Sequence, residues 1–201
     1  MSPVSVPDQR VERGRTTRER LIATARELFG EHGYEGTSIG AVLEASGVAR
    51  GALYHHFPSK EALFDAVLDR VVADIAASAA EAARSADDPV DSLRAASGTW
   101  LELALDPAVQ RIALLDPPAV VGWTRWRELD EQYTLGGLRA NLRRIAADGR
   151  LPEQDVDLLA NMVLASVSEA ALMIARADDP KAAFEAGRAT VDMLLTRLVG
   201  D

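Results

Sequence analysis

Apolar residues recur every three or four positions over most of the chain, which is the pattern of amphipathic helices. Thr16 and Glu19 match an N-terminal capping box, and Gly33 can end a helix that begins there. The apolar face of this first predicted helix carries Leu21, Ile22, Ala25, Leu28 and Phe29. We therefore expect order to begin near Thr16, after a disordered arm at residues 1–14.

Two short helices joined by a tight turn are expected next. Thr37 or Ser38 can cap the first of them, and Gly47 in "ASGV" can take the positive φ that a sharp turn requires. In the second, "ARGALYHHF", Leu53 and Phe57 lie four residues apart and are predicted to face inward. The pattern predicts a helix pair of about 20 residues.

Longer helices fill the rest of the chain. An apolar stripe predicts one helix from Ser59 to Arg84, and Asp-Pro pairs mark later helix starts. The remaining predicted helices cover about 90–105, 107–115, 119–147 with an interruption near Gly136 and Gly137, 153–177 and 181–199. The fold class is therefore predicted to be all-α.

Composition supports this fold and narrows the chemistry. Hydrophobic residues make up 48% of the chain and aromatic residues only 5%, which favours closely packed helices. The absence of cysteine excludes disulfides, thiolate zinc sites and a cysteine nucleophile. The first 20 residues contain no apolar run typical of a signal peptide, and no later stretch approaches the roughly 18 uncharged residues of a membrane span. We expect a cytoplasmic protein with no membrane partner.

The charge is unevenly distributed. Residues 1–70 hold 9 basic and 10 acidic side chains, whereas residues 71–201 hold 13 and 21, so the net charge of −9 lies mainly in the C-terminal part. Within residues 10–26, six arginines accompany only two acids. Such a basic stripe suits phosphate contact, and a solvated helix face is the alternative interpretation.

Two short helices with a glycine turn, braced by a helix on each side, form a helix-turn-helix whose second helix enters a major groove. Arg50 can bond guanine through two donors, and Gly51 allows close backbone approach. Tyr54 and His55 can reach phosphate or a thymine methyl group, and Lys60 is placed for phosphate at the next helix start.

Residues 21–68 carry a pattern that resembles the TetR family of bacterial transcriptional repressors. The matching positions are Ala25, Leu28, Phe29, Gly33, Tyr34 and Thr37, then Ser46 to Val48, Leu53, Tyr54, His56, Phe57, Lys60 and Leu63. The resemblance implies a three-helix DNA-binding domain at residues 15–62. It also implies a helical effector-binding and dimerisation domain at residues 63–201.

The resemblance also implies which side chains face DNA. The predicted contacts are Thr37, Ser38, Arg50, Gly51, Ala52, Tyr54, His55, His56 and Lys60. Many relatives have Ser or Thr where this chain has Ala49, so the recognition helix is expected to lack a side-chain cap. Ala52 offers only a methyl group, so base recognition is expected to depend on Arg50.

Other chemistry for the histidine pair is disfavoured. Adjacent helical residues point about 100° apart, whereas a helical metal pair needs i, i+4 spacing. His32 is the only other histidine, and the chain has no Gly-x-Ser-x-Gly elbow. We expect no metal, no cofactor, no catalytic residues and no enzymatic activity.

The C-terminal part is predicted to hold the effector site and the dimer interface. The expected ligand-binding residues are Trp100, Arg111, Trp123, Trp126 and Tyr133, with ordinary core positions as the alternative. The expected interface residues are Leu164, Val167, Ala171, Ile174, Gly187, Val191 and Leu195, with packing inside one chain as the alternative.

These features together predict a homodimeric repressor on a palindromic double-stranded operator, released by a small, largely apolar effector. Two alternatives stay open. One is an architectural DNA-binding protein without a ligand response, and the other is an enzyme that uses the tryptophan-lined pocket.

Overall fold

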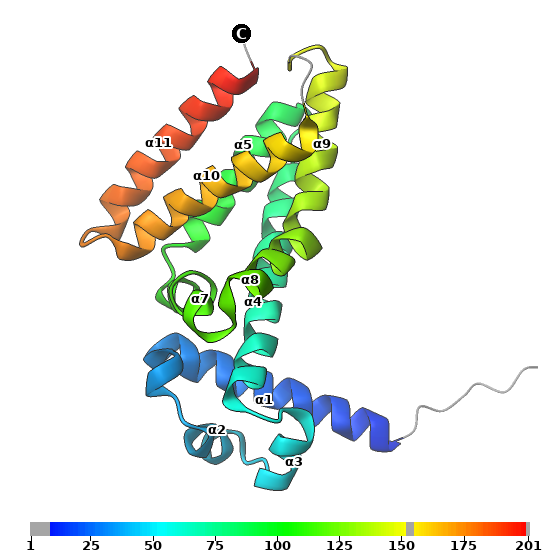
Figure 1. Cartoon of the computed structure of the whole chain (residues 1–201), viewed down its shortest axis with the longest axis vertical. Coiled ribbons are helices and arrows are strands. Elements are labelled where there is room, and N and C mark those ends of the chain that lie inside the picture. Colours follow the sequence, from blue (N-terminus) through cyan, green and yellow to red (C-terminus); the bar gives the residue numbers. More distant parts are fainter. Residues whose placement is uncertain (1–8, 152–154, 200–201) are drawn as a thin grey trace, which may run out of the picture.

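The computed structural model describes residues 9–151 and 155–199, and these ranges contain helices and no strand. Figure 1 shows α1, α2 and α3 at one end of the molecule, α10 and α11 toward the other, and α4 running between them. The bounds are α1 Gln9–Gly36, α2 Ile39–Ser46, α3 Arg50–His56, α4 Lys60–Arg84, α5 Pro89–Leu103, α6 Pro107–Val109, η1 Gln110–Leu115, α7 Pro117–Val120, α8 Gly122–Asp130, η2 Glu131–Leu135, α9 Gly136–Ala147, α10 Val156–Arg176 and α11 Pro180–Val199. The prediction of an all-α fold is confirmed.

The short helices form for the local reasons that the sequence suggests. The Ser38 hydroxyl accepts a hydrogen bond from the Ala41 amide at 3.1 Å and caps α2, and Gly47 ends it with φ 66°. Helix α3 has no side-chain cap at Ala49, as predicted. Leu53 and Phe57 are buried, which confirms their inward orientation.

Helix α1 differs from the prediction at its start. It begins at Gln9, so the disordered arm predicted for residues 1–14 is wrong for residues 9–14, while residues 1–8 lie outside the described residues. Thr16 is inside the helix rather than at its cap. The expected glycine break is present, because Gly33 has φ 73° and ψ 176° within the assigned helix.

The C-terminal part of the chain holds the end of α1. The backbone N–H of Tyr34 donates to the Asp116 carboxylate at 2.8 Å, and the Arg111 guanidinium donates to the carbonyl oxygen of Glu31. These bonds satisfy backbone groups that a helix end leaves without intrahelical partners. Residues 80 and 82 positions away in the sequence therefore fix where the first helix ends.

Two apolar clusters build the core. The first half of helix α4 contributes its buried side chains to the first cluster. Leu63, Phe64, Val67, Leu68 and Val71 of α4 are buried together with α1 and α3, and with Val109, Ile112, Ala113 and Leu129 from later helices. The second cluster joins α5, α9, α10 and α11. The core of the DNA-binding module therefore continues past the boundary predicted at residues 62 and 63.

The middle of the chain breaks at a different glycine from the one predicted. Gly122 has φ 80° and separates α7 from α8, whereas Gly136 has ordinary helical angles and Gly137 lies inside α9. The interruption predicted near Gly136 and Gly137 is therefore wrong. A π-helical segment, η2, leads directly into α9 instead.

Helices α10 and α11 pack against each other within one chain. The positions predicted for a dimer interface are buried within the chain: Leu164, Val167, Ala171, Ile174, Val191 and Leu195, while Gly187 lies beside Ile174 and Ala170. Their contact with a second chain stays a prediction, and Val167, Val191 and Leu195 line the groove between the two helices.

Gly30 marks a close approach of α1 to α6. A Cβ built at Gly30 lies 2.6 Å from the Cβ of Ala108, so Gly30→Ala must push the two helices apart. Overpacking of this kind costs about 1–3 kcal/mol. We expect Gly30→Ala to lower the free energy of unfolding, measured by urea denaturation, by about 1–3 kcal/mol.

Gly98→Ala is the matched control, because a Cβ there meets no atom within 4 Å. Removal of this helical glycine should raise the free energy of unfolding by about 0.5–1 kcal/mol. Equal effects of the two substitutions would show that α1 and α6 do not constrain each other.

Candidate DNA-binding surface and ligand cavity

Helix α3 presents most of the predicted DNA contacts to solvent at the end of the molecule (Figure 1). Arg50, Gly51 and His55 are exposed, Tyr54 is 44% exposed, and Ala52 is half-buried. The buried Leu53 holds the helix against the core from the opposite side. The contacts of these residues with DNA stay predictions, and the geometry leaves their side chains accessible.

Two further predicted contacts, Thr37 and Ser38, have structural roles. Thr37 is buried, and its hydroxyl donates within the chain to the carbonyl oxygens of Leu28 and Gly33. The prediction that the Thr37 side chain contacts phosphate is therefore wrong. Ser38 is exposed, and its hydroxyl caps α2.

Lys60 supports the turn between α1 and α2. Its ammonium group donates to the carbonyl oxygens of Tyr34 at 2.8 Å and Thr37 at 3.1 Å, and it lies 4.0 Å from the centre of the Tyr34 ring. Two of its three donors are used in this way, which leaves one for phosphate. Substitution of Lys60 therefore changes the fold as well as any contact with DNA.

The two histidines have different surroundings although their ring centres are 5.3 Å apart. His55 is exposed, whereas His56 is half-buried and its ring lies near Gly14 of α1. His56 therefore packs between α3 and α1. His55 is the more accessible of the pair for DNA.

Some arginines of the basic stripe on α1 already make contacts within the chain. The Arg18 guanidinium lies 5.3 Å from the centre of the Phe57 ring, and Arg26 pairs with Asp74 of α4 at 2.7 Å. Arg20 remains exposed beside them. The stripe therefore both braces the helix-turn-helix and adds positive charge near it.

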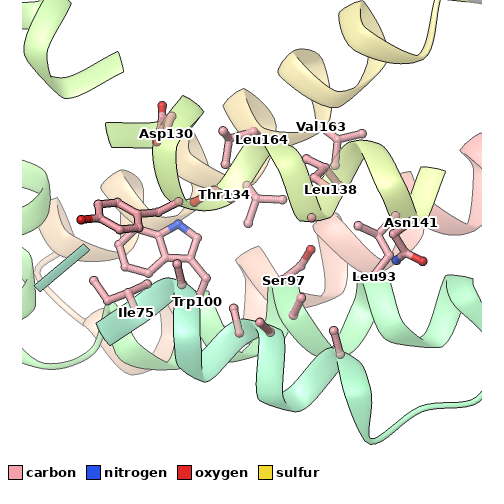
Figure 2. A pocket seen from close by; sticks show the side chains of 18 of the residues that line it. Ile75, Leu93, Ser97, Trp100, Asp130, Thr134, Leu138, Asn141, Val163 and Leu164 are labelled. Carbon is pink, nitrogen blue, oxygen red and sulfur yellow. The ribbon is translucent and has the colours of Figure 1, made fainter. Parts of the chain in front are cut away.

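A cavity of about 580 Å³ lies between α4, α5, α9 and α10, with further lining residues from η1, α8 and η2. Figure 2 shows these side chains converging on one space. Of the five residues predicted to bind a ligand, Trp100, Trp126 and Tyr133 line it. The tryptophan-lined pocket expected in the C-terminal part is thus present, although only three of the five predicted residues line it.

Two predicted ligand contacts lie elsewhere. Arg111 holds the end of α1, so its charge is used between helices and not in the cavity. Trp123 is 62% exposed and contacts Trp126 edge to face at 5.0 Å between ring centres. The predictions that Arg111 and Trp123 line the pocket are wrong, because one faces α1 and the other faces solvent.

Sequence reasoning missed several lining residues. Ser97, Thr134, Asp130 and Asn141 supply polar groups, and α4 supplies a row of alanines, Ala76, Ala79, Ala80 and Ala83. The spacing of these alanines by three and four was visible in the sequence and indicates a face with small side chains. Burial raises the pKa of the Asp130 carboxyl, and the charge of Arg127, 3.2 Å away, partly offsets this.

A polar cluster links the cavity wall to α4. The Tyr133 hydroxyl donates to Asp69 at 2.9 Å, and Arg125 bonds Asp65 at 2.7 Å and Asp69 at 3.3 Å. Burial raises the pKa of the Tyr133 phenol, and its bond to the Asp69 carboxylate acts in the same direction, so the phenol remains a donor. A displacement of Tyr133 would therefore change a hydrogen bond to α4.

An exposed helix in a helix-turn-helix, joined through α4 to an apolar cavity, is the arrangement of a DNA-binding regulator with a ligand site. Residues 21–67 match the family model for bacterial regulatory proteins of the tetR family, and residues 90–198 match that for the tetracyclin repressor-like C-terminal domain. The chain belongs to the TetR family.

Individual relatives agree with this assignment. The HTH-type transcriptional repressor AcnR of Corynebacterium efficiens is 32% identical over 141 residues, which cover 67% of this chain and 69% of AcnR. The Tn10 TetC protein of Escherichia coli is 25% identical over 152 residues, covering 76% and 77%. The crystal structure of a TetR-family regulator from Pectobacterium atrosepticum has a TM-score of 0.83 at 32% identity, covering 94% of this chain and 97% of the other.

The chain is therefore a DNA-binding transcriptional repressor with a C-terminal ligand-binding domain, and release by an effector is typical of its family. It is not an enzyme, so that alternative is wrong. The architectural alternative is also set aside, because the C-terminal domain is of the ligand-binding type. Regulators of this family bind operator DNA, typically as homodimers with small-molecule effectors, and are expected to be cytoplasmic.

Arg50 tests the assignment of base recognition. We expect Arg50→Ala to weaken binding to a specific operator by about 1–3 kcal/mol and to relax selectivity at one or two base pairs. Arg50→Lys, the matched control, keeps the charge but loses the planar pair of donors, so it should preserve affinity for random DNA and still lose selectivity.

Fluorescence anisotropy on operator and scrambled duplexes measures both effects. Equal losses on the two duplexes for Arg50→Ala would show that Arg50 contacts only phosphate.

Proposed function

We propose that two copies of this chain join through the outer faces of α10 and α11 and bind a palindromic operator, and that a ligand in the cavity releases the DNA. The observation that carries this proposal is the position of α4. Its first half is buried in the core of the DNA-binding module, and from Val72 to Arg84 it lines the cavity. A ligand that shifts α4 would therefore shift α3 as well.

Exposed apolar side chains support the proposed interface. Leu158 and Met162 of α10, with Met193 and Leu194 of α11, are each about half exposed or more. Met162 and Leu194 also line a groove of about 210 Å³ between the two helices. Large apolar side chains gathered on one face are typical of a protein contact.

The composition of α10 also supports a protein contact on its outer face. By length and composition alone it is apolar enough to cross a membrane, with a mean hydropathy of 1.8, although core helices of soluble proteins pass the same test. Only 33% of this apolar stretch is buried within the chain. A second chain that packs on α10 and α11 would cover most of the remainder.

A twofold dimer has consequences for the operator. It would place the two α3 helices in major grooves about 34 Å apart, so the operator would consist of two inverted half-sites. The relative AcnR is named as a repressor, which agrees with the proposed direction of regulation.

The polar cluster suggests how the cavity would influence DNA binding. A ligand that displaces the Tyr133 ring would break its bond to Asp69, and Arg125 would then hold α4 differently. A ligand shifts an equilibrium only through different affinities for two states. Here the two states would differ in whether Tyr133 is bonded to α4.

The proposed interface is tested with Met162→Glu. We expect this variant to sediment as a monomer at micromolar concentration, because two buried glutamates at a twofold contact would lack partners. Its affinity for a palindromic operator, selected from genomic fragments of the host, should fall at least a hundredfold, while its weak affinity for one half-site should remain.

Thr124→Glu on α8 is the control, since it adds the same charge at another exposed position. It should remain dimeric. A dimeric Met162→Glu variant with normal operator affinity would refute the interface, and recovery of fragments without a symmetric motif would refute the palindromic operator.

A further inference from the structure

The cavity extends along helix α4. Helix α4 lines it from Val72 to Arg84, which corresponds to about 18 Å at 1.5 Å per residue. Between Ile75 and Arg84 its lining side chains are small, with alanine at 76, 79, 80 and 83. Such a floor favours a slender molecule that lies parallel to α4 over a round one.

The lining offers no unpaired buried charge among the described residues. Arg84 and Arg144 are exposed; Arg84 pairs with Glu81, and Arg144 donates to the carbonyl oxygen of Asp87. The one acid that lines the cavity, Asp130, pairs with Arg127 at 3.2 Å. Because burial of an ion without a partner is very costly, these walls favour an uncharged ligand.

Two donors on α5 make no hydrogen bond with the described residues. Ser97 is only 7% exposed, and neither its hydroxyl nor the indole N–H of Trp100 bonds a residue that the structure describes. In the same lining, the buried Oδ1 of Asn141 also has no partner there. Figure 2 shows both side chains directed from α5 into the cavity, with Thr134 across from them. Buried polar groups normally find a partner, and the indole N–H can only donate.

We propose that the effector is an elongated, uncharged hydrocarbon with one carbonyl or hydroxyl oxygen partway along its length, and that Ser97 and Trp100 donate to this oxygen. Figure 2 supports an oxygen partway along the ligand, because Ser97 lies between Ile75 and Trp100 on one side and Leu93 and Asn141 on the other. This inference rests on the proposed function, in which the cavity holds the effector.

Four probes of similar length test the inference by isothermal titration calorimetry on the full-length protein. They are undecan-6-one, 6-methylideneundecane, undecanoate and undecylammonium. The second replaces the carbonyl oxygen by CH2 at nearly constant shape, and the last two carry opposite charges. We expect undecan-6-one to bind at least threefold tighter than the alkene and at least tenfold tighter than either ion.

Two variants identify the donors. Ser97→Ala and Trp100→Phe should each weaken undecan-6-one about three- to tenfold, the effect of one neutral hydrogen bond, and leave the alkene nearly unchanged. Ser78→Ala is the matched control, because the Ser78 hydroxyl bonds its own helix at Asp74 and does not line the cavity. It should bind all four probes like the parent protein.

Equal or tighter binding of undecanoate or undecylammonium would overturn the inference. So would unchanged ketone affinity in both donor variants, or absence of binding by all four probes. Operator binding by the unliganded protein tests the proposed function separately. A protein that binds its operator but shows no preference for the ketone contradicts only the effector chemistry.

Discussion

Helix α4 takes part in both the DNA-binding core and the cavity wall, and the rest of the structure depends on this constraint. Near its start, Leu63 and Val67 fill the core beneath the DNA-binding helices, and two turns later Ile75 and Ala79 line the cavity. The helix is continuous over 25 residues and spans both sites. The proposed effect of cavity occupancy on α3 depends on α4 moving as one body.

Contacts at the end of α1 strengthen this link. Asp116 bonds the backbone of Tyr34, Arg111 bonds the carbonyl of Glu31, and Gly30 lets α6 approach closely. The DNA-binding module thus rests on the cavity-bearing domain at two separate points, α4 and the end of α1. Its orientation is set by tertiary contacts and not by a flexible linker.

Local features of this fold were predictable, because local chemistry determines them. The cap at Ser38, the turn at Gly47 and the inward position of Leu53 depend on residues a few positions apart. The apolar faces of α10 and α11 were also visible in the sequence. The pattern could not tell whether Val167 would meet α11 of its own chain or a second chain, because both partners need the same apolar face.

The candidate site was harder to predict for a similar reason. Trp100 and Trp126 line the cavity and Trp123 does not, although all three are equally apolar in sequence. Thr37 and Arg111 were misjudged because their bonds are made to carbonyl groups, which have no sequence signature. The unpartnered Ser97 hydroxyl could only be recognised once its neighbours were in place.

Native-state hydrogen exchange along α4 tests the coupling most directly. If both ends of α4 belong to one cooperative unit, amides from Leu63 to Ala79 should open with the same free energy, and low denaturant should lower it equally along the helix. Opening of the Leu63 end at a free energy several kcal/mol below that of the Ala79 end would show that the DNA-binding module unfolds independently. That result would contradict the account.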